Sequence, residues 1–196
     1  MFGAARILVT LWLNLFYRVK VYGAEKIPAS GSAVLCANHT HFKDLILLGC
    51  NTKRKVKWLA KIELFKNPVI GKFLMFLGAF PVRRGENDVS AIKVIYDLLN
   101  KGEIVGIFPE GHRVKDMSKR PEIKRGYVTF AYRTKAPIIP VSIAYGKAPF
   151  GKSQVFSHIK VVFHDPVVLD YEKKYSNEEL DLVAKDIMKN IYSEIA

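Results

Sequence analysis

The sequence is poor in cysteine and in acidic residues. It contains only 2 cysteines, Cys36 and Cys50, which are too few for a disulfide framework and match no spacing of a zinc knuckle. We therefore expect reduced thiols in a cytosolic protein. Aspartate and glutamate number 18 against 31 lysines and arginines, which gives a formal net charge of +13. Such a charge favours anionic partners.

The sequence also lacks an apolar run long enough to cross a membrane. The uncharged stretch of residues 7–17 is shorter than the roughly 20 apolar residues that a spanning helix needs. No small-residue cleavage site follows it, so we do not expect a removable signal peptide. Arg6 precedes this stretch, Arg18 and Lys20 follow it, and it contains Trp12. This pattern favours a helix at a membrane interface, with a helix packed on the protein's own core as the alternative.

Internal repeats, low-complexity tracts and long polar linkers are absent, so we expect a single domain. We divide the chain into a membrane-associated helical segment, residues 1–22, and a domain, residues 23–196. The chain is 49% hydrophobic as well as basic. This pairing suits an anionic membrane surface better than nucleic acid, for which we find no recognisable module. A merely solvated basic surface is the remaining alternative.

Apolar runs alternate with helical patterns along the chain. We expect helices within residues 87–102, 124–136 and 176–195, the last with a Ser176 and Glu179 capping box. Several of the runs read as strands that are apolar on both faces. The predicted strands cover residues 32–37, 56–60, 79–82, 104–108, 138–145 and 159–164. This alternation predicts an α/β fold with a mostly parallel central sheet flanked by helices.

Unusual polar clusters follow three of the predicted strands. His39 comes after the first strand, residues 83–85 (RRG) after the third and residues 109–113 (PEGHR) after the fourth. Because the carboxyl ends of parallel strands meet at one edge of a sheet, we expect the three clusters to form a single site.

The loop NHTHFKD, residues 38–44, carries the candidate chemistry. If a helix begins near Phe42 or Lys43, Asp44 can fold back onto the His39 imidazole and serve as the orienter of a general base. No serine or cysteine stands where it would be activated, so the nucleophile would be a substrate hydroxyl. A structural histidine and a metal site formed by His39, His41 and Asp44 remain as alternatives, although no second cluster completes a metal sphere.

Arginines in the other two clusters indicate a phosphate site. Arg84 and Arg113 would hold phosphate in bidentate forks, and Gly111 would allow close backbone approach. Further basic residues follow and are either solvated or part of the same site: Lys115, Lys119, Arg120, Lys124 and Arg125.

These blocks resemble those of the glycerolipid acyltransferases, which acylate 1-acylglycerol-3-phosphate (lysophosphatidic acid) or glycerol-3-phosphate. NHTHFKD resembles the histidine, four residues, aspartate signature of that family. GAFPVRRG, FPEGHR and APIIPVSI are similar to its second, third and fourth blocks, in the same order. The resemblance covers residues 34–143, most of the predicted domain.

The resemblance implies roles for individual residues. His39 would be the general base and Asp44 its orienter, while Pro140 would line the acyl region. The acceptor phosphate site would consist of Arg84, Glu110, Gly111 and Arg113. The donor would be an acyl thioester on coenzyme A or acyl carrier protein, with no bound cofactor and no metal.

Three positions depart from the family pattern: Arg83, His112 and Val114 stand where aspartate, threonine and serine are common. They bear on the acceptor more than on the reaction. The expected function is acyl transfer to lysophosphatidic acid, forming phosphatidic acid, at the cytoplasmic face of the cell membrane by a monotopic or peripheral protein. Alternatives are acylation of glycerol-3-phosphate, another lysolipid or a lipid A precursor, and a non-catalytic phospholipid-binding protein. No nucleic-acid partner is expected.

Overall fold

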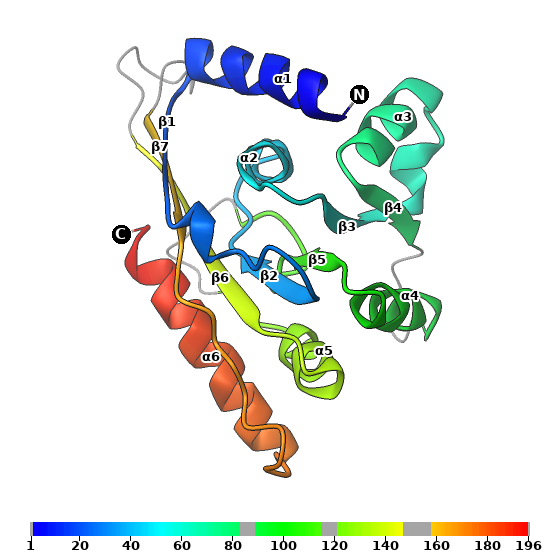
Figure 1. The fold of residues 1–196 in the computed structure, drawn as a ribbon, viewed down its shortest axis with the longest axis vertical. Helices are drawn as coiled ribbons and strands as arrows, with labels where there is room; N and C mark the ends of the chain where they lie inside the picture. The colour runs from blue at the N-terminus through cyan, green and yellow to red at the C-terminus, as the bar shows by residue number, and fades with distance from the viewer. Residues whose placement is uncertain (1, 83–88, 115–120, 147–157, 196) are drawn as a thin grey trace.

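A seven-stranded sheet forms the centre of the protein. The computed structural model describes residues 2–82, 89–114, 121–146 and 158–195, and within them the strand order is β1-β7-β6-β2-β5-β3-β4 (Figure 1). All neighbouring strands in this order are parallel except the antiparallel pair β6 and β7. The predicted mostly parallel α/β fold is thereby confirmed. The strands are β1 (Arg18–Tyr22), β2 (Ala33–Ala37), β3 (Val56–Lys61), β4 (Ala79–Val82), β5 (Ile104–Ile107), β6 (Ile138–Tyr145) and β7 (His158–Phe163).

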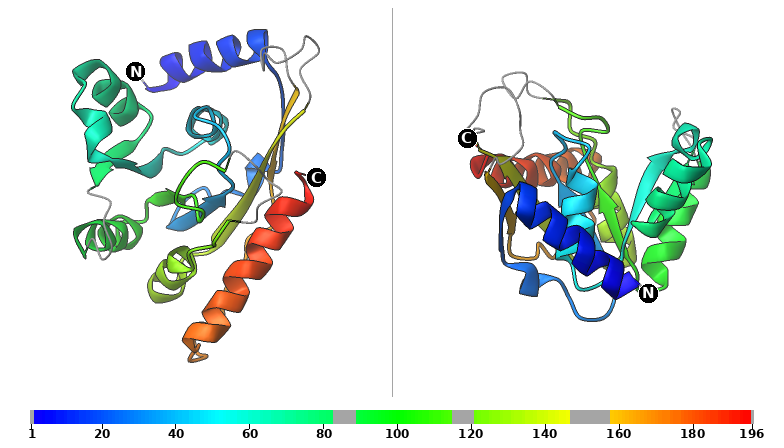
Figure 2. Two further views of the ribbon diagram at one scale, coloured as in Figure 1. Left: turned by 180° about the vertical axis from the view of Figure 1, so that it is seen from behind. Right: turned by 90° about the horizontal axis from the view of Figure 1, so that it is seen from above.

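Helices cover both faces of the sheet (Figures 1 and 2). They are α1 (Phe2–Phe16), α2 (Asp44–Asn51), α3 (Pro68–Phe76), α4 (Val89–Asn100), α5 (Gly126–Thr134) and α6 (Asn177–Ser193), with short 3₁₀ turns η1 (Ala24–Lys26) and η2 (Ile62–Phe65). The central strand β2 is buried along its whole length. Leu35 packs into a core with α1, α2 and α3, whereas Val34 and Cys36 pack into a second core with α4, α5 and α6. This alternation explains why β2 is apolar at every position.

Two predicted helix ends appear in the structure. The Ser176 side chain accepts from the Glu179 N–H and the Glu179 side chain accepts from the Ser176 N–H, which completes the predicted capping box. Gly102 follows α4 with φ of 76°, a conformation that favours glycine. The predicted caps of that helix, Asn87 and Asp88, lie outside the described residues.

The N-terminal helix packs on the protein and also exposes apolar side chains. Leu13 is buried in the core, while Ile7, Leu11 and Leu15 are exposed on the outer side. None of the helices in the described part of the chain has the length and apolar character needed to cross a bilayer. Membrane contact by α1 therefore stays a prediction.

The two cations that follow α1 lie on β1, a strand that is not among those predicted from the sequence. Arg18 and Lys20 occupy exposed positions of β1, which pairs in parallel with β7. Residues 18–22 thus belong to the sheet that the rest of the chain builds. Val19 and Val21 alternate with the two cations in the period of two that is typical of a strand, but five residues are too few to stand out.

Candidate active site

The loop after β2 is fixed to β6 by a buried asparagine. Asn38 is 0% exposed, and its side-chain amide donates to the Ile143 carbonyl at 2.9 Å. Its side-chain oxygen accepts from the Ile143 N–H at 2.7 Å. Both polar ends of the Asn38 side chain are therefore satisfied, which makes this loop a rigid support for the next residue, His39.

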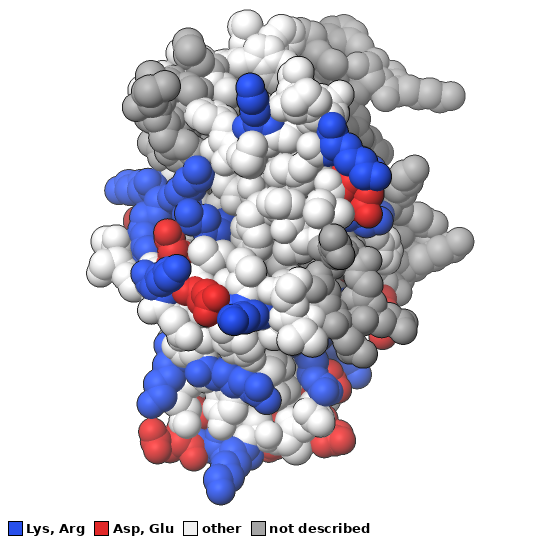
Figure 3. All heavy atoms as spheres, turned by 90° about the vertical axis from the view of Figure 1, so that its right-hand side faces the viewer, with Lys and Arg blue, Asp and Glu red and all other residues white. Residues whose placement is uncertain are grey.

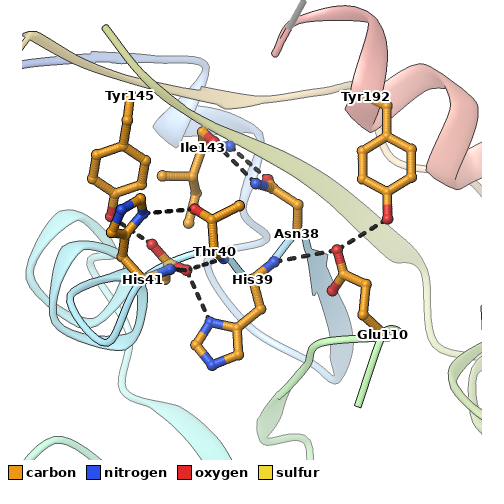
Figure 4. Close-up of polar contacts among 9 residues, drawn as sticks. Asn38, His39, Thr40, His41, Glu110, Ile143, Tyr145 and Tyr192 are labelled. Carbon is orange, nitrogen blue, oxygen red and sulfur yellow. Dashed lines mark hydrogen bonds and ion pairs between the residues drawn. The ribbon is translucent and has the colours of Figure 1, made fainter. Parts of the chain in front are cut away.

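His39 and Asp44 form the predicted pair. His39 Nδ1 lies 2.8 Å from Asp44 Oδ2, and the Asp44 side chain is fully buried. A dashed line at the His39 ring marks this contact in Figure 4. An ionised carboxylate only accepts hydrogen bonds, so Nδ1 carries the proton and Nε2 holds the free lone pair of the neutral ring. The pair therefore places a base at Nε2, on the side of the ring away from Asp44.

The backbone and a tyrosine hold Asp44 in place. The N–H groups of Thr40 and His41 each donate to Asp44 Oδ2 at 2.8 Å. The Tyr145 hydroxyl, from the end of β6, donates to Oδ1 at 2.5 Å. Burial and the adjacent Asp44 carboxylate raise the pKa of Tyr145, so this hydroxyl remains a donor. Because Asp44 begins α2, its charge also stands at the favourable end of the helix dipole.

Glu110 supports the histidine from the neighbouring strand. It follows β5, which pairs with β2. Its Oε1 accepts a hydrogen bond from the backbone N–H of His39 at 3.3 Å and another from the Tyr192 hydroxyl at 3.0 Å. The side chain is buried, and burial raises its pKa to about 7. Its second oxygen is buried with no hydrogen-bond partner among the described residues. The contact confirms that the loops after the first and fourth predicted strands meet.

A stack of rings lies beneath the base. Phe108 is the middle ring of the stack. Its centroid lies 4.1 Å from that of the His39 ring and 5.1 Å from that of the Trp58 ring, with 17° between the ring planes in both pairs. Trp58 fits because Gly106 in β5 has no side chain: a Cβ there would come within 2.3 Å of the indole. The stack fixes the plane of the imidazole, while the Asp44 contact fixes its rotation.

A cavity of about 750 Å³ opens beside His39. Apolar side chains from α2, β3, η2, α3 and the loops after β2 and β5 line it together with basic side chains. The apolar set is Phe42, Leu45, Ile46, Leu59, Ala60, Leu64, Leu74 and Phe108, and the basic set besides the histidines is Lys61, Arg113 and Lys124. The space therefore offers both an apolar surface for a chain and cations for an anionic group, with the base on its wall.

A second cavity of about 650 Å³ lies on the other side of the same loop. His41, Lys43, Arg113 and Tyr145 are among the residues that line it. The His41 ring packs 4.0 Å from the Tyr145 ring, and burial lowers its pKa. Arg113 thus borders both cavities.

The residues predicted to bind phosphate have different surroundings in the structure. Gly111, with φ of 70°, turns the chain after β5, and both it and Arg113 line the cavity beside His39. Glu110 is turned into the protein instead. Arg84 lies outside the described residues, as do Arg83 and Gly85. The roles of these residues in binding phosphate remain predictions.

Pro140 lies inside β6, buried beside Cys36 of β2. Among the described residues, those that line the two cavities do not include Pro140. The role of Pro140 in the acyl region therefore stays a prediction. Both cysteines are buried, and burial raises the pKa of the Cys36 thiol.

The alternatives for the histidine loop can be compared with these contacts. His39 is 19% exposed at its side chain and lines a cavity, unlike a histidine satisfied within a core. Across residues 2–82, 89–114, 121–146 and 158–195, no group of three or more histidine, cysteine, aspartate or glutamate side chains has an arrangement that would hold a metal ion.

Several residues of the site were not singled out from the sequence. Tyr145 had a usable signal, since it ends a strand at the same edge as His39. Asn38 directly precedes the histidine, but asparagine is common in loops. Tyr192 had no signal, because it lies on the last helix, 82 positions from its partner Glu110. Trp58 reads simply as a core residue of a strand.

Comparison with known proteins identifies the family of this chain. The sequence profile of the family described as Acyltransferase matches residues 18–144. The chain belongs to this family. The matched range runs from the start of β1 into β6 and includes the His39 and Asp44 pair, Glu110 and Arg113. The protein is therefore an acyltransferase, as predicted.

Relatives of this acyltransferase share both its sequence and its fold. It is 36% identical over 184 residues to the 1-acyl-sn-glycerol-3-phosphate acyltransferase of Bacillus subtilis, covering 91% of this chain and 89% of the relative. A chloroplastic 1-acyl-sn-glycerol-3-phosphate acyltransferase of Brassica napus is 32% identical over 168 residues, covering 80% of this chain and 48% of the relative. The crystal structure of the 1-acyl-sn-glycerophosphate (LPA) acyltransferase PlsC from Thermotoga maritima superposes with a TM-score of 0.69 at 27% identity, covering 90% of this chain and 71% of that chain.

Proposed function

We propose that this acyltransferase transfers a fatty acyl group from an acyl thioester to the sn-2 hydroxyl of 1-acylglycerol-3-phosphate, forming phosphatidic acid for phospholipid biosynthesis. The observation that carries the proposal is the cavity that His39 lines together with apolar side chains and the cations Arg113 and Lys124. Lysophosphatidic acid has the matching parts: one acyl chain, one phosphate and a free hydroxyl between them. Relatives named for this activity support the same acceptor.

In the proposed reaction, His39 Nε2 takes the proton of the sn-2 hydroxyl as that oxygen attacks the thioester carbonyl. The buried Asp44 carboxylate, 2.8 Å from Nδ1, stabilises the imidazolium that forms. The tetrahedral intermediate collapses, the carbon–sulfur bond breaks, and the imidazolium returns its proton to the leaving sulfur. The products are the ester and a free thiol, so no serine or cysteine of the protein is consumed.

The cations of the cavity position the acceptor in this proposal. Arg113 and Lys124 would bind the phosphate, and Gly111 would let it approach the backbone. Glu110 would position His39 rather than bind phosphate, because its Oε1 accepts a hydrogen bond from the backbone N–H of His39. Holding the hydroxyl near Nε2 in this way contributes several kcal/mol, roughly, to lowering the barrier.

The thioester carrier would be acyl carrier protein or coenzyme A. Peripheral binding to the cytoplasmic face of the cell membrane would give access to the lysolipid, with the exposed side of α1 (Ile7, Leu11 and Leu15) in contact with lipid.

Thiol release by the purified protein in detergent tests the proposal. Palmitoyl thioesters of coenzyme A and of acyl carrier protein would each be offered with lysophosphatidic acid or with glycerol-3-phosphate. We expect release that depends on lysophosphatidic acid and that falls at least about 10²-fold in His39→Ala. His158→Ala, at an exposed position of β7, serves as the matched control and should keep full activity.

Each other outcome has a definite meaning. Release only with glycerol-3-phosphate would replace the acceptor while keeping the reaction. A His39→Ala protein with normal turnover would overturn the assignment of the base. Lipid binding without thiol release in any combination would point to the non-catalytic alternative.

A further inference from the structure

The segment that follows β3 carries apolar side chains on its outer side as well as its inner side. On α3, Leu74 and Gly71 face the protein and are buried, whereas Val69 is 76% exposed and Met75 is 51% exposed. An outward helix face that combines apolar side chains with a lysine is typical of a helix lying at a lipid interface. Since one side of α3 already packs on the core, the other side lacks a covering partner among the described residues.

We call this outer side the η2–α3 surface. It consists of the exposed apolar residues Ile62, Leu64, Val69, Ile70, Phe73 and Met75. In the space-filling view of this side, a broad uncharged area is bordered by lysine and arginine side chains (Figure 3). Single exposed apolar residues are ordinary, but six within one short segment mark an interaction site.

The charges within this segment are mostly positive. Residues 61–76 contain three lysines, Lys61, Lys66 and Lys72, and one acid, Glu63, so their net charge is 3 − 1 = +2. All three lysines are exposed. Lysines beside an exposed apolar helix face can extend their ammonium groups to lipid phosphates while their stems cover apolar surface.

The surface adjoins the two other features that concern lipid. Figures 1 and 2 both place α3 beside the N-terminal end of α1, whose outer side is also apolar. Leu64 of η2 and Leu74 of α3 line the cavity that contains His39. A lipid layer against this surface would therefore lie next to the space that holds the acyl chain.

We propose that the η2–α3 surface binds the surface of an anionic phospholipid bilayer, as a second contact beside α1. The proposal rests on the proposed function only for its purpose, namely delivery of a lysolipid to the cavity. A second copy of the chain is a poorer occupant, because a two-fold dimer through this surface would bring the positive charges of both copies, Lys66 and Lys72 among them, into one interface.

Binding to vesicles tests the proposal. The full-length protein would be co-sedimented with vesicles of phosphatidylglycerol and phosphatidylcholine, and with vesicles of phosphatidylcholine alone. We expect Val69→Ser/Phe73→Ser to bind the anionic vesicles roughly tenfold or more weakly than the unmodified protein, since two apolar side chains lose their contact with lipid. Lys72→Glu should weaken binding to the anionic vesicles and leave the weak binding to phosphatidylcholine unchanged.

The control replaces two exposed apolar side chains elsewhere on the protein. Val168→Ser/Leu182→Ser changes two residues that are 64% and 60% exposed on the side of α6, the opposite face of the sheet. It should bind as the unmodified protein does. Equal binding by Val69→Ser/Phe73→Ser and the unmodified protein would overturn the proposal. A dimer in light scattering that only the Val69→Ser/Phe73→Ser variant loses would also overturn it, in favour of a second copy.

Activity on a soluble acceptor separates this proposal from the proposed function. With a short-chain lysophosphatidic acid below its micelle concentration, Val69→Ser/Phe73→Ser should keep the thiol release of the unmodified protein, because neither residue lines a cavity. Loss of that activity would assign the two residues to the site itself and overturn the docking role. If the unmodified protein binds vesicles through this surface but releases no thiol, the docking role holds and the proposed function fails.

Discussion

The hydroxyl of Tyr192 donates to Glu110 Oε1 at 3.0 Å, and the same oxygen accepts from the N–H of His39. The last helix, α6, is thereby joined, through one carboxylate, to the backbone of the loop that carries His39 (Figure 4). Tyr192 touches no reacting atom, so we regard it as a positioning residue.

Replacing Tyr192 with phenylalanine tests this role. A hydrogen bond to a buried carboxylate contributes about 1.5–3 kcal/mol, so we expect turnover to fall roughly tenfold with little change in KM. The hydrogen bond from Tyr192 lowers the pKa of Glu110, so its loss should raise that pKa further. Steady-state kinetics across pH would measure both effects. Tyr132→Phe, which removes an exposed hydrogen bond to the Lys173 carbonyl, is the control. Equal losses in the two variants would argue against a specific role.

Tyr145 is predicted to matter through Asp44. Its hydroxyl reaches Oδ1 of a carboxylate that is fully buried, so Tyr145→Phe leaves that oxygen without this donor. We expect turnover to fall about tenfold, with binding of the thioester unchanged. Tyr22→Phe, at a half-exposed tyrosine of β1, should have no effect. Full activity in Tyr145→Phe would show that the two N–H donors to Oδ2 suffice.

Adding one methyl group at Gly106 should disturb the base from a distance. The new Cβ would come within 2.3 Å of the Trp58 ring, which stacks on Phe108 and through it on His39. We expect Gly106→Ala to cost about 1–3 kcal/mol in the free energy of unfolding and to lower turnover as well. Urea unfolding and thiol release would measure the two effects.

Gly49 offers the contrasting substitution. It lies buried inside α2, where an added Cβ would meet the Leu77 carbonyl oxygen at 3.9 Å, an ordinary contact. Alanine is preferred to glycine within a helix, so Gly49→Ala should be neutral or stabilising. Destabilisation of equal size at both positions would contradict the steric argument for Gly106.

Glu110 should make stability depend on pH. Burial raises its pKa from 4.5 to about 7 on folding, so the folded protein holds this proton more tightly than the unfolded chain does. The contribution of the protonated carboxyl is fully present below about pH 4.5 and is lost as pH rises to about 7. The expected loss is roughly 3 kcal/mol in the free energy of unfolding.

Glu110→Gln removes this titration. The difference in unfolding free energy between it and the unmodified protein should therefore change over pH 4.5 to about 7 and stay constant above that range. Urea unfolding at several pH values measures the difference. Glu122→Gln, at an exposed glutamate, is the control and should run parallel to the unmodified protein. A parallel curve for Glu110→Gln would contradict the prediction.

Local sequence patterns predicted the parts of the fold that have a local cause. The six predicted strands were found because each is apolar or alternating over four or more residues. The capping box at Ser176 was found because its two partners lie three positions apart. His39 and Asp44 were paired for the same reason, since both belong to one loop.

The remaining parts depend on which distant segments meet. β1 is short and half exposed, and only its pairing with β7 makes it a strand. Tyr192 and Glu110 are joined by the docking of α6, which no periodicity in either segment encodes. The ring stack requires β3 to lie beside β5, so that Trp58 faces Gly106 across the two strands.

The positions of the two tryptophans make the protein's intrinsic fluorescence informative. The sequence contains 2 tryptophans, and they lie in very different surroundings. Trp58 is buried two rings away from the base, whereas Trp12 is 50% exposed on α1. Emission from Trp58 would report on changes around the imidazole, and emission from Trp12 on the surroundings of the first helix. Single replacement of either tryptophan by phenylalanine would separate the two signals without attaching a dye.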